Sequence, residues 1–317
     1  MSICVSRAAG LAVLCGAAAC HAGTIRHDRL DQAYRDRAAL PQFQSVGRYT
    51  TNGLIGSFTV IAPNWAVTAA HVVDVNANGA IDENISDDAL QIGSQFRTPT
   101  QIFVPTGVNG NRGWNGDINS GFDIALVHFN TPFNAITPAS IYNSFQELGS
   151  EITSVGFGQG GTGKTGATGG TTIKRAGDNV VDQFVTFSNG ATALRWDFDE
   201  PAPRASSNFS GSTVPLDMEY MIGPGDSGGG SFIFEGGEWF LAGVHSGTYD
   251  LFNYPGATSN TSTYGDASLI TRVAAYQQFI LSNIPELALS IPEPSGVAIL
   301  VVGGLAAGSQ RRRRRDR

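Results

Sequence analysis

Five consecutive residues, Gly225-Asp226-Ser227-Gly228-Gly229, constrain the fold of this chain more than any other stretch of its sequence. Glycines on both sides of the serine allow a tight bend and let the main chain approach a bound molecule without intervening side chains. A serine that attacks a carbonyl carbon needs such exposure, with backbone N–H groups nearby to stabilise the developing oxyanion. Gly, Asp and Ser also dominate ordinary turns, so the run alone is equally consistent with a simple turn.

Two further stretches argue against a simple turn. His71 ends an apolar run over residues 67–70, and Asp123 opens a second apolar run over residues 124–126. An aspartate beside a histidine holds the imidazole in the tautomer that accepts a proton from a serine hydroxyl. We therefore predict that His71, Asp123 and Ser227 form a catalytic triad.

In the order His, Asp, Ser these motifs resemble those of the trypsin-like serine proteases. The stretch from Gly56 through Trp65 to His71 is similar in length to the first-barrel pattern of that family, and residues 270–280 resemble its closing strand and C-terminal helix. The resemblance covers about residues 43–283. It implies an all-β fold of two packed six-stranded antiparallel β-barrels with a C-terminal helix.

The same resemblance implies a serine endopeptidase that hydrolyses peptide bonds of protein or peptide substrates through an acyl-enzyme. Ser227 would attack the carbonyl, and the N–H groups of Gly225 and Ser227 would form the oxyanion hole. Asp226 would form a structural ion pair that shapes the loop. The alternative is a catalytically silent member of the fold that serves as an envelope adhesin or matrix component, and labelling by a serine-directed phosphonate distinguishes the two.

The resemblance also marks five residues for substrate binding: Met221, His245, Ser246, Thr248 and Ser268. Met221 stands where enzymes that cut after Lys or Arg carry an aspartate. A basic side chain would be buried there without a partner at a cost of several kcal/mol, so we predict non-tryptic specificity. His245, just before Ser246, resembles the histidine of the glutamate-specific members, and the hydroxyls of Thr248 and Ser268 would assist it, so the resemblance implies cleavage after Glu or Asp. Alternatively, His245 packs beneath the triad and Met221 helps to form a pocket for apolar residues.

Composition agrees with a β-rich body. Glycine accounts for 40 of the 317 residues, about twice the usual share, and only 15% of residues are charged. Helical periodicity is clear only over residues 273–282. Residues 23–310 carry 13 basic and 26 acidic side chains, a net charge of −13, which argues against nucleic acid or an anionic membrane as a partner.

The first 22 residues predict a secretory signal peptide, with Arg7 before an apolar run over residues 8–19 and a small-residue cleavage site ending at Ala22. Acylation of Cys20 is an alternative. Cleavage after Ala22 would remove all three cysteines of the sequence, Cys4, Cys15 and Cys20. A body without cysteine must be held together by its core alone, in contrast to family members that brace the histidine with a disulfide.

The charged segment 23–40 is consistent with a propeptide, a surface strap or a linker. Many members of the family free a buried N-terminus that pairs with the acid before the serine, here Asp226. The start sequence Ile-Val-Gly-Gly that accompanies this step is absent.

The C-terminal residues 286–317 resemble a PEP-CTERM sorting signal of Gram-negative bacteria. Pro292-Glu293-Pro294 precedes a short apolar stretch over residues 296–308, which is followed by five arginines at 311–315. Thirteen residues are few for a stable transmembrane span, which favours a transient signal, with the arginines on the cytoplasmic side. We predict export to the cell envelope or the extracellular space, involving export and C-terminal sorting machinery. The protease domain then covers residues 41–285.

Residues 74–83 match the first half of a calcium loop. Asp74, Asn76, Asn78 and Asp82 are candidate ligands, and Gly79 stands at the sixth position, where the loop bends. Ile85 replaces the glutamate expected at the twelfth position. Glu83, Asp87 or Asp88 could take its place. The residues leave two interpretations open, a structural calcium and a solvated acidic turn, and no cofactor is required.

Residues 158–165 fit the phosphate-loop pattern letter for letter. A phosphate loop must lead into a helix, whose N-terminus faces the phosphate. The glycine- and threonine-rich residues 166–172 do not favour a helix. We therefore expect a surface loop of the protease and no nucleotide.

Overall fold

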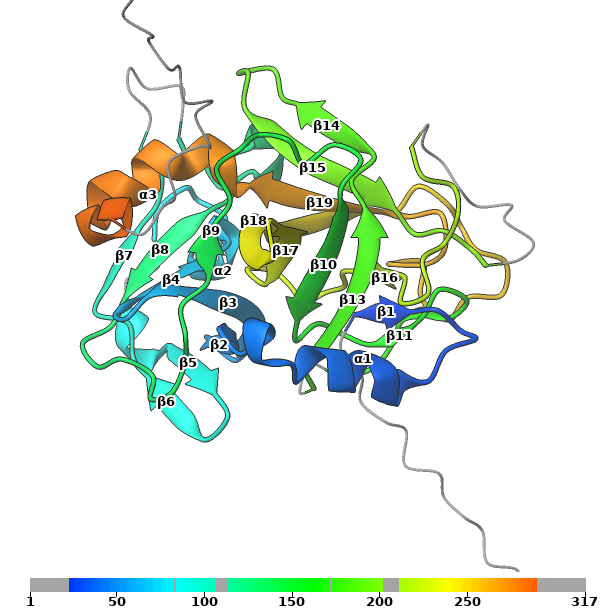
Figure 1. Ribbon diagram of the computed structural model, residues 1–317, viewed down its shortest axis with the longest axis horizontal. Coiled ribbons are helices and arrows are strands. Elements are labelled where there is room, and N and C mark those ends of the chain that lie inside the picture. Colours follow the sequence, from blue (N-terminus) through cyan, green and yellow to red (C-terminus); the bar gives the residue numbers. More distant parts are fainter. Residues whose placement is uncertain (1–22, 82–83, 107–112, 171–172, 202–210, 290–317) are drawn as a thin grey trace, which may run out of the picture.

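Short strands joined by tight turns dominate the computed structural model, which describes residues 23–81, 84–106, 113–170, 173–201 and 211–289 (Figure 1). The predicted signal peptide, Asp82 and most of the predicted sorting tail lie outside these residues. The described strands form two large sheets and one small one.

The first large sheet contains seven antiparallel strands in the order β6-β5-β2-β3-β4-β8-β7. Their bounds are β2 Val46–Thr51, β3 Leu54–Ala62, β4 Trp65–Thr68, β5 Ala89–Ile92, β6 Gln95–Arg97, β7 Gln101–Phe103 and β8 Ala125–His128. The hairpin between β2 and β3 turns at Asn52 and Gly53, with φ of 46° and 77°. An Asn-Gly pair suits a two-residue hairpin because both residues tolerate positive φ.

The second large sheet follows the order β13-β10-β17-β18-β19-β15-β14, and β9 adds to β18 in parallel. Its strands are β9 Ser140–Ile141, β10 Glu151–Gly156, β13 Arg175–Val180, β14 Gln183–Thr186, β15 Thr192–Asp197, β17 Gly230–Glu235, β18 Glu238–Tyr249 and β19 Ala267–Arg272. The all-β prediction with two β units and a C-terminal helix is confirmed. The two sheets have seven and eight strands among the described residues, more than the six expected for each barrel.

Short helices connect and flank the sheets. They are α1 Asp31–Ala38, η1 Pro41–Phe43, α2 Ala70–Val73, η2 Ile85–Asp87, η3 Ile118–Ser120, η4 Val273–Tyr276, α3 Gln277–Asn283 and η5 Pro285–Leu289. In Figure 1, α3 lies beside the first sheet, where the chain returns after β19. Ile280 of α3 is buried in the same apolar core as residues of the first sheet, so the last helix closes that core.

The segment that precedes the first sheet packs against the second one. Strand β1 (Thr24–Ile25) pairs with β11 (Gly161–Thr162) and with β16 (Tyr220–Met221), and β11 pairs in turn with β12 (Gly166–Ala167). Helix α1 lies along β13 (Figure 1). Tyr34 and Ala38, four residues apart on one face of α1, are buried there. Residues 23–40 are therefore integrated into the fold.

Candidate active site

The pairing of β4 with β8 brings His71 and Asp123 together. These strands run antiparallel, with Thr68 opposite Ala125. His71 lies just beyond the end of β4, in α2, and Asp123 lies just before the start of β8. Because the end of one antiparallel strand lies beside the start of its partner, two residues 52 positions apart in sequence become neighbours.

Asp123 holds His71 through two hydrogen bonds. The backbone N–H of His71 donates to Oδ1 at 2.9 Å, and Nδ1 of the imidazole donates to Oδ2 at 2.7 Å. The Asp123 side chain is 1% exposed and that of His71 is 27% exposed. A carboxylate only accepts hydrogen bonds, so the proton of the neutral ring is on Nδ1 and Nε2 keeps its lone pair. That is the tautomer a general base requires.

The environment of His71 favours its protonated form. Burial lowers the pKa of His71, but the charge of Asp123 and its hydrogen bond to the ring raise it by more, so that the pKa lies above its ordinary value. Asp123 thus orients the ring and stabilises the imidazolium ion that proton transfer would create.

A third side chain supports Asp123. The hydroxyl of Ser246, on β18, donates to Asp123 Oδ2 at 2.5 Å, and Thr271 Oγ1 donates to the backbone carbonyl of Asp123 at 2.8 Å. These bonds tie the first sheet to the second at the site. Ser246 was predicted to bind substrate, and no local pattern in the sequence indicates its contact with Asp123, because the two residues are 123 positions apart.

The loop around Ser227 is fixed through its carbonyl groups. Ser57 N–H donates to the carbonyl of Ser227 at 2.7 Å, and Ser57 Oγ donates to that of Gly225 at 3.1 Å. Within the described chain the N–H groups of Gly225 and Ser227 have no hydrogen-bond acceptor. Gly225 has φ of 95°, and a Cβ on Gly228 would lie 2.1 Å from Thr68 Oγ1. Only glycine suits these two positions.

Asp226 anchors the loop from inside. Its Oδ1 accepts from Gly158 N–H at 2.7 Å, and its Oδ2 accepts from Gly223 N–H at 2.8 Å and Tyr220 OH at 3.2 Å. Burial raises the pKa of Asp226 to about 6, although these donors favour its charged form. Among the described residues it has no ion pair, so the predicted ion pair is replaced by neutral donors.

The glycine-rich stretch 158–165 begins with the residue that binds the Asp226 carboxylate. A Cβ on Gly158 would lie 2.3 Å from Asp226 Oδ2, so glycine is required where the main chain meets the carboxylate. β11 lies within this stretch and β12 follows it directly, so a strand stands where a phosphate loop would need a helix.

A cleft of about 450 Å³ opens between the two sheets around His71 and Ser227. Ser227 is half-buried. In the described structure no hydrogen bond joins the two side chains, and such bonds often tighten only when substrate binds. The first sheet and the segment around α2 contribute Thr51, Gly53, Leu54, Ile55, Gly56, His71, Val72 and Val75, and the loops that follow β10 and β16 contribute Gln159, Pro224, Gly225 and Ser227.

Comparison with protein-family models agrees with this geometry. The model described as trypsin matches residues 38–280. The chain belongs to the trypsin family. It is therefore a trypsin-like serine protease by family, and protein or peptide substrates are those of its class. No curated protein matches the chain in a sequence search.

His245 of this trypsin-family chain does not line the cleft. It is fully buried, and its Nδ1 lies 3.1 Å from the carbonyl oxygen of Asp226 while Nε2 lies 3.0 Å from Ser231 Oγ. A carbonyl only accepts, so Nδ1 is the donor and Nε2 accepts from the serine. Burial lowers the pKa of His245 to about 3, which keeps the ring neutral. This geometry matches the alternative in which His245 packs beneath the triad.

The other residues predicted to bind substrate are also outside the cleft lining described above. Met221 and Ser268 are fully buried and in contact, with Ser268 Oγ 3.2 Å from Met221 Sδ. Met221 packs in an apolar cluster with Phe198 and Tyr264. Thr248, farther along β18, is half-buried.

The candidate calcium loop is closed by its own hydrogen bonds. Asp74 is buried, and its carboxylate accepts from Asn78 N–H at 3.1 Å, Gly79 N–H at 2.8 Å and Trp114 Nε1 at 2.7 Å. Asn76 Oδ1 accepts from the N–H of Asn78 at 3.1 Å. The described residues contain no group of three or more His, Cys, Asp or Glu side chains that could hold a metal ion, and Asp82 lies outside them.

Two predictions concern residues at the ends of the chain. None of the helices in the described part is long and apolar enough to cross a membrane. The apolar stretch 296–308 of the predicted tail and the predicted signal peptide 1–22 lie outside that part.

Proposed function

We propose that this protein is an exported serine endopeptidase in which Ser227 attacks the peptide carbonyl and His71 accepts its proton. The observation that carries the proposal is the double hydrogen bond from His71 to the buried carboxylate of Asp123, in a cleft that Ser227 also lines. The N–H groups of Gly225 and Ser227, without acceptors in the described chain, are the proposed donors to the oxyanion.

Reaction with a biotinylated serine-directed phosphonate tests this proposal. We expect stoichiometric labelling of the wild-type chain, and loss of both labelling and peptide hydrolysis in Ser227→Ala with little change in thermal stability, because the side chain is small and half-buried. Ser57→Ala is a useful comparison, since it removes a loop contact and keeps the nucleophile. A wild-type chain that folds and remains unlabelled would favour the silent envelope protein.

We propose non-tryptic specificity, with preference for an apolar residue before the cut. Met221 in place of an acid gives a basic side chain no partner, and its apolar neighbours Phe198 and Tyr264 support an apolar environment. Recognition of an acidic residue by His245 is less favoured, because the ring is neutral and both nitrogens are engaged. A peptide library that varies this residue tests the proposal, and a preference for Glu that is lost in His245→Gln would overturn it.

We propose that residues 23–40 remain with the mature enzyme as a strap. If cleavage follows Ala22, the new N-terminus is Gly23, which packs against the side chain of Tyr220. Tyr220 in turn donates to Asp226, so the strap supports the loop of the nucleophile. N-terminal sequencing of the active protein tests this, and a start near residue 41 would identify the segment as a propeptide.

We further propose export to the cell envelope or extracellular space, with removal of the tail 286–317 by sorting machinery. The tripartite pattern of that tail supports the proposal. A structural calcium in the Asp74 loop is a separate proposal. The buried Asp74 carboxylate and the side-chain oxygens of Asn76 and Asn78 lie in one tight turn, and oxygen ligands of this kind suit calcium.

A further inference from the structure

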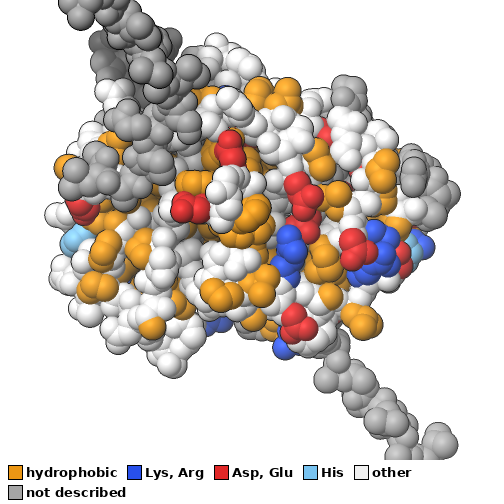
Figure 2. Space-filling view, in the orientation of Figure 1, with side chains coloured by type: hydrophobic (Ala, Val, Ile, Leu, Met, Phe, Trp, Pro, Cys, Tyr) orange, Lys and Arg blue, Asp and Glu red, His pale blue; other side chains and the backbone are white. Residues whose placement is uncertain are grey.

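A second cavity lies away from the cleft of His71 and Ser227. Its volume is about 560 Å³, which is within the range of ligand-binding pockets. Residues of α1, β10, β17 and β18 line it, together with residues that follow β9, and it shares no residue with the cleft. Figure 2 shows hydrophobic and acidic side chains next to one another over β9, β10 and β17 on this face.

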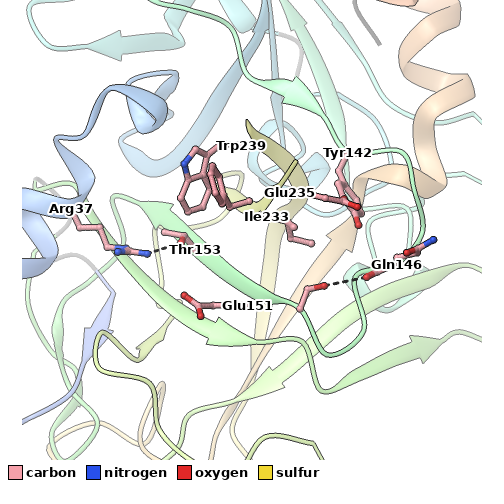
Figure 3. A pocket seen from close by; sticks show the side chains of 10 residues that line it. Arg37, Tyr142, Gln146, Glu151, Thr153, Ile233, Glu235 and Trp239 are labelled. Carbon is pink, nitrogen blue, oxygen red and sulfur yellow. Dashed lines mark hydrogen bonds between the residues drawn. The ribbon is translucent and has the colours of Figure 1, made fainter. Parts of the chain in front are cut away.

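The basic residue in this cavity is already neutralised. Arg37 lies at one end (Figure 3), and its guanidinium donates to Asp178 Oδ1 at 2.5 Å and to Thr153 Oγ1 at 3.1 Å. Thr153 itself donates to the same carboxylate oxygen at 2.7 Å. Arg37 and Asp178 thus form a partly buried ion pair with no net charge. An anionic ligand would have to compete with Asp178 for Arg37.

Two acidic residues in the cavity have no such partner. Glu151, at the start of β10, and Glu235, at the end of β17, are both exposed. Neither forms an ion pair with any residue in the described ranges. Figure 3 places Glu235 beside Tyr142 at the end opposite Arg37. Burial raises the pKa of Tyr142 and the charge of Glu235 raises it further. The cavity therefore carries about two negative charges.

Aromatic and apolar side chains supply the walls between these charges. Trp239 and Phe234 lie with ring centroids 5.1 Å apart at an angle of 45°, and Phe234 is 56% exposed. Ile233 lies between the two ends of the cavity in Figure 3. Aromatic faces attract cations, and the methylene stem of an arginine or lysine side chain packs well on apolar surface.

From this arrangement we propose that the cavity is a secondary binding site for a peptide segment that carries arginine or lysine, located on the substrate protein. The basic head group would pair with Glu151 or Glu235, and its stem would lie against Trp239. The choice of a peptide rests on the proposed protease function. The charge selectivity rests on the cavity alone. A site of this kind would recruit substrates with basic segments, although Met221 does not favour a basic residue before the cut.

Binding can be measured without cleavage in the full mature chain carrying Ser227→Ala. The probe is the fluorescently labelled peptide Gly-Arg-Gly-Arg-Gly with blocked ends, and its matched control has citrulline in place of both arginines, which keeps the shape and removes the charge. We expect saturable binding of the arginine peptide in low salt, no saturable binding of the citrulline peptide, and weakening as salt screens the charges.

Variants locate the site. In Glu151→Gln/Glu235→Gln we expect about 3- to 30-fold weaker binding, the range for loss of two exposed charge pairs. Glu238→Gln is the matched control because Glu238 is opposite Glu235 in the hairpin but does not line the cavity, and its effect should stay below about twofold. Trp239→Ala should weaken binding by about two- to fivefold.

Three results would overturn the proposal. They are equal binding of the citrulline peptide, no saturable binding of the arginine peptide, and unchanged affinity in the glutamine double variant with an unchanged melting temperature. Binding of a neutral oligosaccharide such as chitotetraose that depends on Trp239 and not on the two glutamates would identify a carbohydrate site instead. If the phosphonate fails to label the wild-type chain but the arginine peptide still binds, the proteolytic function is rejected. The charge selectivity of the cavity is then still supported.

Discussion

The dependence of folding stability on pH tests whether the buried ring of His245 is neutral in the folded chain. The ring is fully buried, and burial lowers its pKa in the folded chain to about 3, whereas the ordinary value is 6.5. As pH falls through 6.5 the unfolded chain binds a proton at this position, and the folded chain does not until about pH 3. The stability that the neutral ring contributes above pH 6.5 is therefore lost progressively as pH falls.

The magnitude follows from the difference between the two pKa values. A difference of about 3.5 units corresponds to about 5 kcal/mol between the two ends of this range, and about 2 kcal/mol of it is lost between pH 7 and pH 5. Asp226 acts in the opposite direction. Its pKa is raised from 3.8 to about 6, so it contributes stability below pH 3.8 that is lost as pH rises through 6. Wild-type stability alone therefore does not isolate His245.

A comparison with His245→Gln removes the contribution of Asp226. Glutamine keeps one donor and one acceptor and does not titrate. We expect the stability difference between the parent and this variant, both carrying Ser227→Ala to prevent autolysis, to shrink by about 2 kcal/mol from pH 7 to pH 5. For a chain of this size that is roughly 4–8 °C in melting temperature. Urea unfolding followed by tryptophan fluorescence gives the free energies, with pH 8 as the reference. A difference that stays constant between pH 7 and pH 5 would refute a buried neutral histidine.

Four other predictions concern the active site, the proposed calcium loop and the proposed C-terminal sorting tail. Because His71 must be neutral to accept a proton and its pKa is raised, kcat/KM should increase with pH around a midpoint above 6.5; a midpoint below 6.5 would contradict the influence of Asp123. Ser246→Ala removes a hydrogen bond to a buried charge, so unfolding should become easier by about 1.5–3 kcal/mol, and an unchanged urea midpoint would contradict it. Calcium should raise the melting temperature of the parent chain and not of Asp74→Ala, whereas equal curves with and without chelator favour a solvated turn. Mass spectrometry of protein from the cell envelope should find no peptides from residues 296–317, and an intact C-terminus would indicate a retained anchor.

The fold class and the proposed triad could be predicted from the sequence because local chemistry limits both. Glycine at 225 and 228 is demanded by backbone geometry, and the apolar runs beside His71 and Asp123 are buried strands whose ends meet. The Asn52-Gly53 turn is a local signal of the same kind. Residue types and their order along the chain carry the resemblance to the trypsin-like proteases, so the sequence alone indicated the triad, whereas the β4–β8 pairing that joins His71 to Asp123 is a property of the fold.

The surroundings of the proposed triad were decided by long-range packing. Ser246 was predicted to contact substrate, but the register of β18 brings its hydroxyl to Asp123. The expected ion pair of Asp226 is replaced by Gly158, Gly223 and Tyr220. A shift of one residue in strand register turns an inward-pointing side chain outward. The composition of a short strand does not specify that register.

The sequence by itself determined the order of the chemical groups and the positions where only glycine fits, because these depend on backbone sterics and residue type. Only the tertiary structure decided which groups share a cavity. Arg37 meets Asp178 across 141 positions, and Glu151 and Glu235 come to line one cavity with Trp239 because β10 pairs with β17 and β17 pairs with β18. Pairing between distant strands is set by burial of the whole core. No local sequence pattern therefore predicts which side chains this pairing brings together on a surface.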